Sequence, residues 1–303
     1  MKNSSNSIEI AIAWCLAWGE GREPLFDLNV LQQMRRALTV EEEVPVEVRE
    51  IVDRVRELEK LPFPETLEDL KQLTEKHPIL WESKIGLVYG GATKIKQYVF
   101  EAAKLPDIRG ASALLDRINL VDIPAFFAEP RKSVSVSEWL KEKENFPNLE
   151  AALIKELLVY YKGGNILAFC PAAFVDDLAD AIEKRYTYET LTANSCAVGE
   201  TFSLLEIRFG LLKQSIENTP WLDWYHENYN QPLVQAYFGF PANELERIQK
   251  FKNHKSFNEL TTKLAVLFNQ RRSGNDFPNR PSRRYPPMFE THPYLRRDES
   301  DRR

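Results

Sequence analysis

A glycine pair beside a short apolar run is the first feature of this sequence that could do chemistry. Gly90 and Gly91 close that run, and Ala92, Thr93 and Lys94 follow, with Thr93 in place to cap a helix. Free backbone N–H groups and the helix dipole at such a turn favour a bound phosphate. The pattern therefore predicts a nucleotide-binding turn at these residues; a plain tight turn with a threonine cap is the alternative.

A second glycine pair lies between two β-type runs, 157–161 and 166–169. Runs of this kind joined by Gly163, Gly164 and Asn165 are typical of a β-hairpin. The hairpin resembles that of the palm domains of polymerases and nucleotide cyclases, in which this turn and the first strand carry carboxylates that hold Mg²⁺, an ion that prefers hard, charged oxygen ligands. Asn165 and Ile166 supply no such charge, and the first strand ends in glycine. We therefore predict that Gly163, Gly164 and Asn165 contact a nucleotide, and that the hairpin holds no metal and catalyses no reaction.

Arginines gather near the C-terminal end of the sequence, interleaved with prolines and aromatic residues. Such a stretch cannot bury a core, so residues 271–303 are predicted to be a tail or a linker. Arginine and aromatic side chains suit RNA phosphates and bases, which makes Arg271, Arg272, Arg283 and Arg284 candidate RNA contacts. A solvated linker that contacts a neighbouring domain is the alternative.

Hydrophobic spacing divides the chain into regions that would position these residues. Residues 1–80 predict helices, with Val48, Ile51 and Val55 on one apolar stripe. Residues 84–210 follow the order strand, helices, strand–turn–strand, helix, strand, which is the βαββαβ plan of a ferredoxin-like, palm-like domain. Residues 211–270 are predicted to be helical again. The expected fold class is therefore α+β, with helical N-terminal and C-terminal regions around the palm-like domain.

Two helices within residues 84–210 can be assigned faces. The first is predicted at about 109–121, with Val121 at the end of its apolar face. The second is predicted at about 172–186, and its acidic side chains are expected to form a solvated face. These are Asp176, Asp177, Asp180 and Glu183. A charged insertion spans about 129–147.

Composition indicates an ordinary globular protein of the cytoplasm. Hydrophobic residues make up 43% and charged residues 28%, and the net charge is −5, so any nucleic-acid-binding surface must be local. Cys15, Cys170 and Cys196 form no CxxC pair, which favours buried, reduced thiols over disulfides or a zinc site. The apolar run at 8–18 contains Glu9 and is too short to cross a bilayer, so we expect a buried helix or strand there and no membrane association.

Two phrases of the sequence, taken together, resemble a known family. Residues 99–116 read VFEAAKLPDIRGASALLD, and residues 159–169 read VYYKGGNILAF. This pair resembles the first, degenerate palm domain of the "Cas ten" large subunit of type III CRISPR effector complexes, of the Cmr type. The resemblance covers about residues 80–210. It makes Arg109 and Ser112, at a predicted helix start, further candidates for contact with a nucleotide or a partner palm; ordinary solvent contacts are the alternative.

The resemblance implies a function in RNA-guided antiviral defence. Members of the family scaffold a complex of CRISPR subunits with crRNA and target RNA, and their second palm makes cyclic oligoadenylates from ATP. Because ATP sits between the two palms, this chain would supply half of the pocket. ATP binding is expected when it is paired with a second palm, and binding by the chain alone is left open; the chain is expected to carry no cofactor of its own.

The sequence departs from the complete family pattern in its catalytic motifs. No histidine is followed by aspartate, so the HD nuclease motif is missing, and neither a Gly-Gly-Asp-Asp turn nor a cysteine cluster occurs. We therefore expect a non-catalytic N-terminal fragment of such a subunit, truncated or split relative to the family, that is not itself an enzyme.

Two other functions are kept as alternatives. The chain could be an RNA-binding interaction module that acts through its basic tail. It could also be a free-standing nucleotidyl cyclase with displaced carboxylates, which neither the first strand nor the hairpin turn carries.

Overall fold

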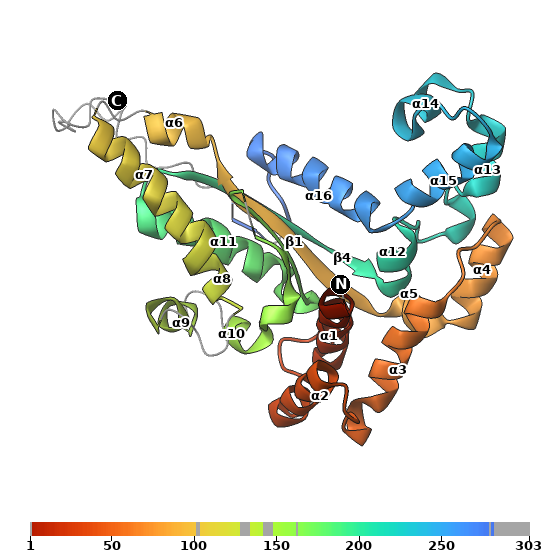
Figure 1. Ribbon diagram of the computed structural model, residues 1–303, viewed down its shortest axis with the longest axis horizontal. Coiled ribbons are helices and arrows are strands. Elements are labelled where there is room, and N and C mark those ends of the chain that lie inside the picture. Colours follow the sequence, from red (N-terminus) through yellow and green to blue (C-terminus); the bar gives the residue numbers. More distant parts are fainter. Residues whose placement is uncertain are drawn as a thin grey trace.

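The computed structural model describes residues 2–100, 104–127, 134–141, 148–161, 163–278 and 280–281 (Figure 1). Helices predominate in this part of the chain and surround a small antiparallel sheet, so the expected α+β class is confirmed. Among the described residues, no helix is both long and apolar enough to cross a membrane.

The sheet has four strands in the order β2-β3-β1-β4. Their bounds are β1 (Lys84–Thr93), β2 (Leu158–Tyr160), β3 (Asn165–Pro171) and β4 (Asn194–Ser203). β1 is central and antiparallel to both neighbours, with Leu87 opposite Phe169 on one side and Glu200 on the other. β2 and β4 form the edges, and the β2–β3 hairpin is the one that the glycine-flanked apolar runs predict.

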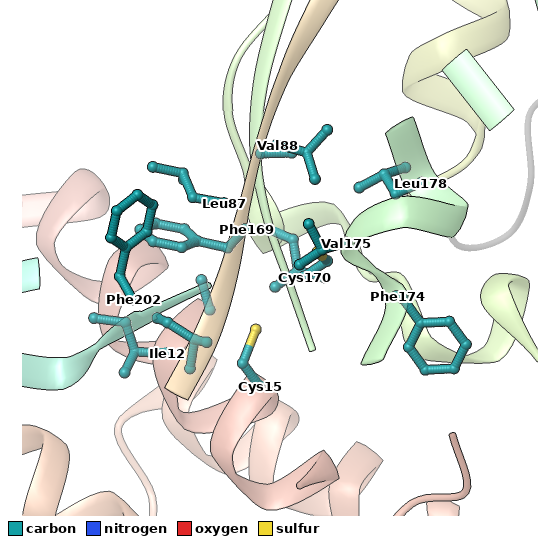
Figure 2. Close-up of a cluster of buried hydrophobic side chains, with 14 of the residues drawn as sticks. Ile12, Cys15, Leu87, Val88, Phe169, Cys170, Phe174, Val175, Leu178 and Phe202 are labelled. Carbon is teal, nitrogen blue, oxygen red and sulfur yellow. The ribbon is translucent and has the colours of Figure 1, made fainter. Parts of the chain in front are cut away.

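Helices cover both faces of the sheet. Successive residues of β1 point to opposite faces, so alternate side chains pack against different helices. Figure 2 shows Leu87 on the side of Ile12, which comes from α1 (Lys2–Trp18), and Val88 on the side of Leu178, which comes from α11 (Val175–Thr190). Leu87, Val88 and Leu178 are fully buried. The C-terminal helix α16 (Phe257–Arg272) also packs against β1 and β4.

The N-terminal helices confirm the predicted helical region, and the apolar run at 8–18 is a buried helix, α1. The others are α2 (Leu28–Val40), α3 (Val46–Lys60), α4 (Leu67–Lys76) and α5 (Pro78–Glu82). The indole Nε1 of Trp14 donates a 2.9 Å hydrogen bond to the Ala152 carbonyl. Thr66 and Asp69 form a reciprocal capping box that begins α4.

The connection from β1 to β2 is helical and is interrupted by residues outside the described ranges. Its elements are α6 (Ile95–Phe100), α7 (Leu105–Arg117), the π-helical turn η1 (Ile118–Asp122), α8 (Ile123–Ala125), α9 (Val134–Lys141), α10 (Leu149–Ala152) and the 3₁₀ turn η2 (Lys155–Leu157). The predicted helix at 109–121 therefore begins earlier and changes its winding at Ile118. As a result Val121, predicted to face inward, is 43% exposed, while Asp122 is 1% exposed.

The segment after β4 is helical, as predicted for residues 211–270. It contains α12 (Leu204–Phe209), the 3₁₀ turn η4 (Ile216–Asn218), α13 (Leu222–Asn228), α14 (Pro232–Phe238), α15 (Glu244–His254) and α16. An aromatic cluster joins it to the N-terminal helices: Phe63 stacks on Trp221 at 5.3 Å between ring centroids, and Trp221 donates to the Pro64 carbonyl at 3.0 Å. Buried apolar residues from 10 to 268 consequently form one continuous core.

Candidate functional site

The hairpin turn between β2 and β3 has the backbone geometry that requires glycine. Gly163 and Gly164 have φ values of 69° and 86°, in the left-handed region that other residues rarely adopt. Asn165 follows as the first residue of β3 and is half-buried. The hairpin turn that the sequence predicts is therefore confirmed. Its two glycines are needed because the chain reverses with positive φ values.

The first glycine pair lies inside a strand, so the predicted strand-to-helix turn at Gly90 and Gly91 is wrong. β1 continues through both glycines to Thr93, and Gly91 lies opposite Asn165 of β3. A Cβ atom on Gly91 would lie 2.1 Å from the Gly164 carbonyl oxygen. A Cβ atom on Gly90 would lie 2.4 Å from Ala197 Cβ of β4, so Gly91 allows close packing against the hairpin and Gly90 allows close packing against β4.

The structure brings the two glycine pairs together at one end of the sheet. The Ala92 backbone N–H donates to the Gly164 carbonyl at 3.2 Å, which ties β1 to the hairpin turn. We call this set of residues the glycine junction. It comprises Gly90, Gly91, Ala92, Gly163, Gly164 and Asn165. Residues predicted separately from two segments of the sequence thus form one locus, which is what a shared ligand site requires.

Thr93 and Lys94 follow the glycine junction in the sequence, and their secondary structure differs from the prediction. Thr93 is buried, ends β1 and pairs with Asn194 in the sheet. Lys94 has a left-handed φ of 52°, is exposed, and begins the turn into the short helix α6. The strand therefore extends to Thr93, past the glycine pair at which the sequence predicts its end.

Arg109 and Ser112 are exposed residues within α7, which begins at Leu105 with Pro106 in its first turn. The prediction that they lie at a helix start is therefore wrong. In the described part of the chain, neither has a hydrogen bond or ion pair with the glycine junction. Their predicted contact with a nucleotide or a partner palm stays a prediction.

Sequence reasoning missed two polar residues beside the glycine junction, Asn119 and Tyr186. The Tyr186 hydroxyl donates a hydrogen bond to Asn119 Oδ1, and a Cβ atom on Gly164 would lie 3.9 Å from Asn119 Nδ2. Asn119 belongs to the π-helical turn η1, which the apolar spacing of its neighbours does not reveal. The only signal in the sequence is the isolated polar residue inside the apolar run 118–121.

Carboxylates are absent from the glycine junction itself. Asn165 and Ile166 stand where a two-metal site would carry carboxylates, and Ile166 is buried. Across the described ranges, no group of His, Cys, Asp or Glu side chains is arranged to hold a metal ion. The polar groups that the glycine junction presents are backbone groups and the Asn165 amide.

The chain matches no family model, no curated protein sequence and no solved structure.

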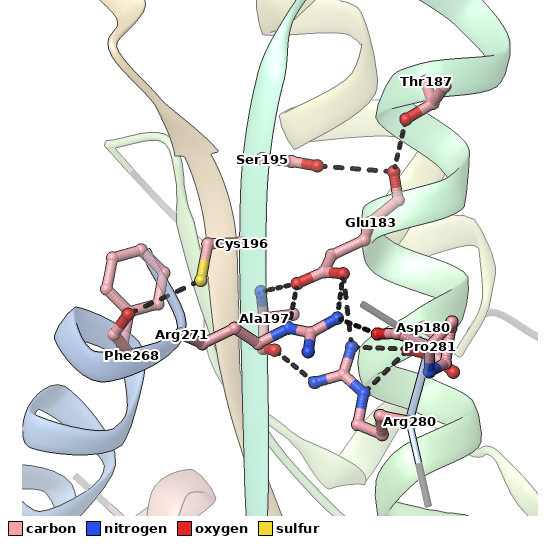
Figure 3. A network of polar contacts seen from close by, with 10 residues as sticks. All are labelled: Asp180, Glu183, Thr187, Ser195, Cys196, Ala197, Phe268, Arg271, Arg280 and Pro281. Atoms are coloured by element: carbon pink, nitrogen blue, oxygen red, sulfur yellow. Dashed lines mark hydrogen bonds and ion pairs between the residues drawn. The ribbon is translucent and has the colours of Figure 1, made fainter. Parts of the chain in front are cut away.

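The acidic side chains of α11 form an ion-pair cluster across β4, shown in Figure 3, so the predicted solvated face is wrong. Arg271 from α16 holds Glu183 with two hydrogen bonds of 2.8 and 2.7 Å. Arg280 donates to Asp180 at 2.7 Å and to the Ala197 carbonyl at 2.5 Å. Burial raises the pKa of Asp180, and the Arg280 cation opposes that rise. The cluster closes the outer edge of β4.

This cluster also changes the predicted RNA contacts. Arg271 is fully buried, so it does not lie where the predicted RNA contact requires an exposed guanidinium, whereas Arg272 is exposed. Arg283 and Arg284 lie outside the described residues. The tail predicted for 271–303 also begins too early, because α16 extends to Arg272 and the side chain of Arg280 is 1% exposed.

Two more carboxylates at the start of α11 differ from the prediction of free solvation. Asp177 forms a 2.6 Å ion pair with Arg22, from the segment that joins α1 and α2. Asp176 has a raised pKa, mainly because burial disfavours its charged form. The three cysteines are buried and form no disulfide with one another, as the sequence predicts.

Proposed function

We propose that this chain is a non-catalytic, palm-like part of the large subunit of a type III CRISPR effector complex. The proposal rests on the paired sequence phrases at 99–116 and 159–169. The second phrase spans the β2–β3 hairpin, and the first includes α7, the helix that leads to Asn119. Both phrases therefore belong to the elements that surround the glycine junction.

The strand order supports the palm-like, ferredoxin-like assignment. β1, a helical connection, the β2–β3 hairpin, α11 and β4 follow one another along the chain, and the sheet order is β2-β3-β1-β4 with antiparallel neighbours. This arrangement is that of two interleaved split βαβ units. Helices α1 and α16 add a second layer to it.

The glycine junction without carboxylates is the observation that supports the non-catalytic part of the proposal. Gly91 and the Gly164 turn lie in contact at the place where the hairpin meets β1. A catalytic palm needs acidic residues on both segments to hold its metals. This chain has neutral residues there, which fits a domain that binds or scaffolds and leaves catalysis to a partner.

The same locus is the proposed half-pocket for ATP. Its polar groups are backbone and amide dipoles with Lys94 close by in the chain, and such groups suit phosphate oxygens. A second palm, opposite the glycine junction, would complete the pocket. The partners in this proposal are the other type III CRISPR subunits, crRNA and target RNA.

The non-catalytic part of the proposal is tested with the purified full chain, ATP and either Mg²⁺ or Mn²⁺. We expect ATP to remain unchanged, with neither hydrolysed nor cyclised products by chromatography. ATP turnover that disappears when Gly163 and Gly164 are replaced by alanine would show catalysis at the hairpin and contradict the proposal.

A further inference from the structure

The π-helical turn η1 places an amide side chain beside the hairpin. Five residues, Ile118–Asp122, are wound with π geometry directly after α7. A π-turn inserts an extra residue into a helix and often occurs at functional sites. Here it turns Asn119 toward Gly164 while Ile118 and Asp122 remain buried.

Tyr186 fixes the orientation of this amide. Its side chain is fully buried on α11, and its hydroxyl donates to Asn119 Oδ1. Burial also raises the pKa of Tyr186, so the hydroxyl stays protonated and remains a donor at neutral pH. With Oδ1 used as the acceptor, the Nδ2 amino group is directed to the hairpin, 3.9 Å from where a Gly164 Cβ would lie.

The amino group of Asn119 has no acceptor among the described residues, although the side chain is half-buried. An amide nitrogen carries two hydrogens and donates only, so it is complementary to an oxygen acceptor. Gly164 itself has no side chain, and Ile95 Cδ1 lies 3.3 Å from the position of its missing Cβ, so the amino group faces the glycine junction beside an apolar methyl group. The Asn119 amino group is therefore a hydrogen-bond donor of fixed orientation that is available to a ligand.

The carboxylates near Asn119 are paired with arginines. Asp122 is held by Arg185 at 2.8 Å, and Glu189 lies 3.4 Å from Arg117. These carboxylates therefore set no unpaired negative charge against a phosphate oxygen at Asn119. Lys94, which follows the glycine junction in the sequence, is exposed.

We infer that Asn119 is a ligand-binding residue of the glycine junction, which donates its Nδ2–H to a phosphate oxygen of a nucleoside triphosphate and is held in place by Tyr186. This inference rests on the proposed nucleotide site and adds to it the residue that selects the phosphate group. Tyr186 acts through Asn119 and is a positioning residue.

The test measures binding of ATP, tripolyphosphate and adenosine to the full chain by NMR titration at millimolar ligand. Asn119→Asp keeps the oxygen that accepts from Tyr186 but replaces the donor with a negative charge. We expect at least about tenfold weaker binding of ATP and tripolyphosphate, since the donated bond to a charged group is lost, and unchanged binding of adenosine. Tyr186→Phe should weaken the same two ligands by a smaller factor.

Asn218→Asp is the matched control, because it makes the same charge change at an exposed residue of η4. Its affinities should equal those of the wild-type chain. The comparison uses only variants whose melting temperature equals that of the wild-type chain. Unchanged tripolyphosphate binding in Asn119→Asp would overturn the inference alone, as would a loss confined to adenosine. Failure of the wild-type chain to bind any of the three ligands would overturn the nucleotide site itself.

Discussion

Gly91 is the residue on which the shape of the glycine junction depends most directly. It has a positive φ of 155°, and a Cβ atom there would lie 2.1 Å from the Gly164 carbonyl oxygen. Backbone on both sides of this contact belongs to paired strands or to the hairpin turn, so neither side can move without loss of hydrogen bonds.

We predict that Gly91→Ala destabilises the chain by about 2–4 kcal/mol, measured as the free energy of unfolding in urea, because the methyl group forces the hairpin away from β1. Gly110→Ala is the matched control: Gly110 lies inside α7, and a methyl group added there would have no other atom within 4 Å. That change should stabilise the helix by about 0.5–1 kcal/mol. Equal effects of the two substitutions would refute this account of the contact.

Asp176 gives a residue-scale prediction about pH. Burial raises its folded-state pKa above the ordinary value of 3.8, so the folded chain binds this proton more tightly than the unfolded chain. The resulting contribution to stability is present below pH 3.8 and is lost as the pH rises through the folded pKa.

Asp176→Asn removes this titration and keeps the size of the side chain. We predict that the variant is more stable than the wild-type chain at pH 7, and that the difference shrinks as the pH falls toward 3.8. Urea midpoints measured from pH 4 to pH 7 provide the comparison. A variant that is less stable at pH 7 would mean that the Asp176 charge stabilises the fold.

At the scale of elements, the strands and most helices could be predicted because apolar periodicity records which face is buried. The hairpin at Gly163 and Gly164 is a local signal, since a tight turn with positive φ needs glycine. The turn predicted at Gly90 and Gly91 was wrong for the complementary reason: glycine in a strand also marks close approach of a neighbouring backbone, here the hairpin.

Elements held by long-range polar contacts could not be predicted in the same way. The π-helical turn at Asn119 has the same local sequence character as an ordinary helix, and it is stabilised by Tyr186 from α11. Likewise Arg280 belongs to a stretch that composition marks as a tail, yet its partner Asp180 lies 100 residues earlier in the sequence. Only the packed structure brings such partners together.

The edge of β4 offers a test at this scale. Glu183 accepts a 2.8 Å hydrogen bond from the Ala197 N–H, and Arg280 donates to the Ala197 carbonyl, so two side chains replace the missing neighbouring strand. Removal of one partner from a buried ion pair typically costs about 3–5 kcal/mol, because the other charge is left uncompensated.

We expect Arg280→Met to destabilise the chain by about 3 kcal/mol and to speed hydrogen exchange in β4 more than in β3. Arg36→Met, at an exposed position of α2, serves as the control and should change stability by less than about 0.5 kcal/mol. Exchange rates that stay unchanged along β4 in Arg280→Met would show that the arginine does not close this edge.

At the scale of the whole molecule, the sheet is enclosed by helices from both ends of the described chain. Trp14 in α1 and Phe268 in α16 belong to the same apolar core, which joins the N-terminal helices, the sheet and the C-terminal helices. The glycine junction lies at the end of this body, near α6 and α7 (Figure 1). Such a body supports the glycine junction rigidly, as a scaffold for a partner palm requires.

The net charge of −5 bears on how this molecule would meet RNA. Two arginines of the predicted basic tail, Arg271 and Arg280, are used in internal ion pairs and do not add to a solvent-facing basic surface. In the proposed complex, crRNA is therefore expected to be held mainly by other subunits, and this chain to join through protein contacts.

The proposed membership in a type III CRISPR effector can be tested by purifying the tagged full chain from its native host. The co-purifying RNA is sequenced and the proteins are identified by mass spectrometry, with the tag alone as control. We predict enrichment of CRISPR-derived guide RNAs together with other type III subunits. Recovery of the chain by itself, or with RNA no richer in guide sequences than the control, would contradict it.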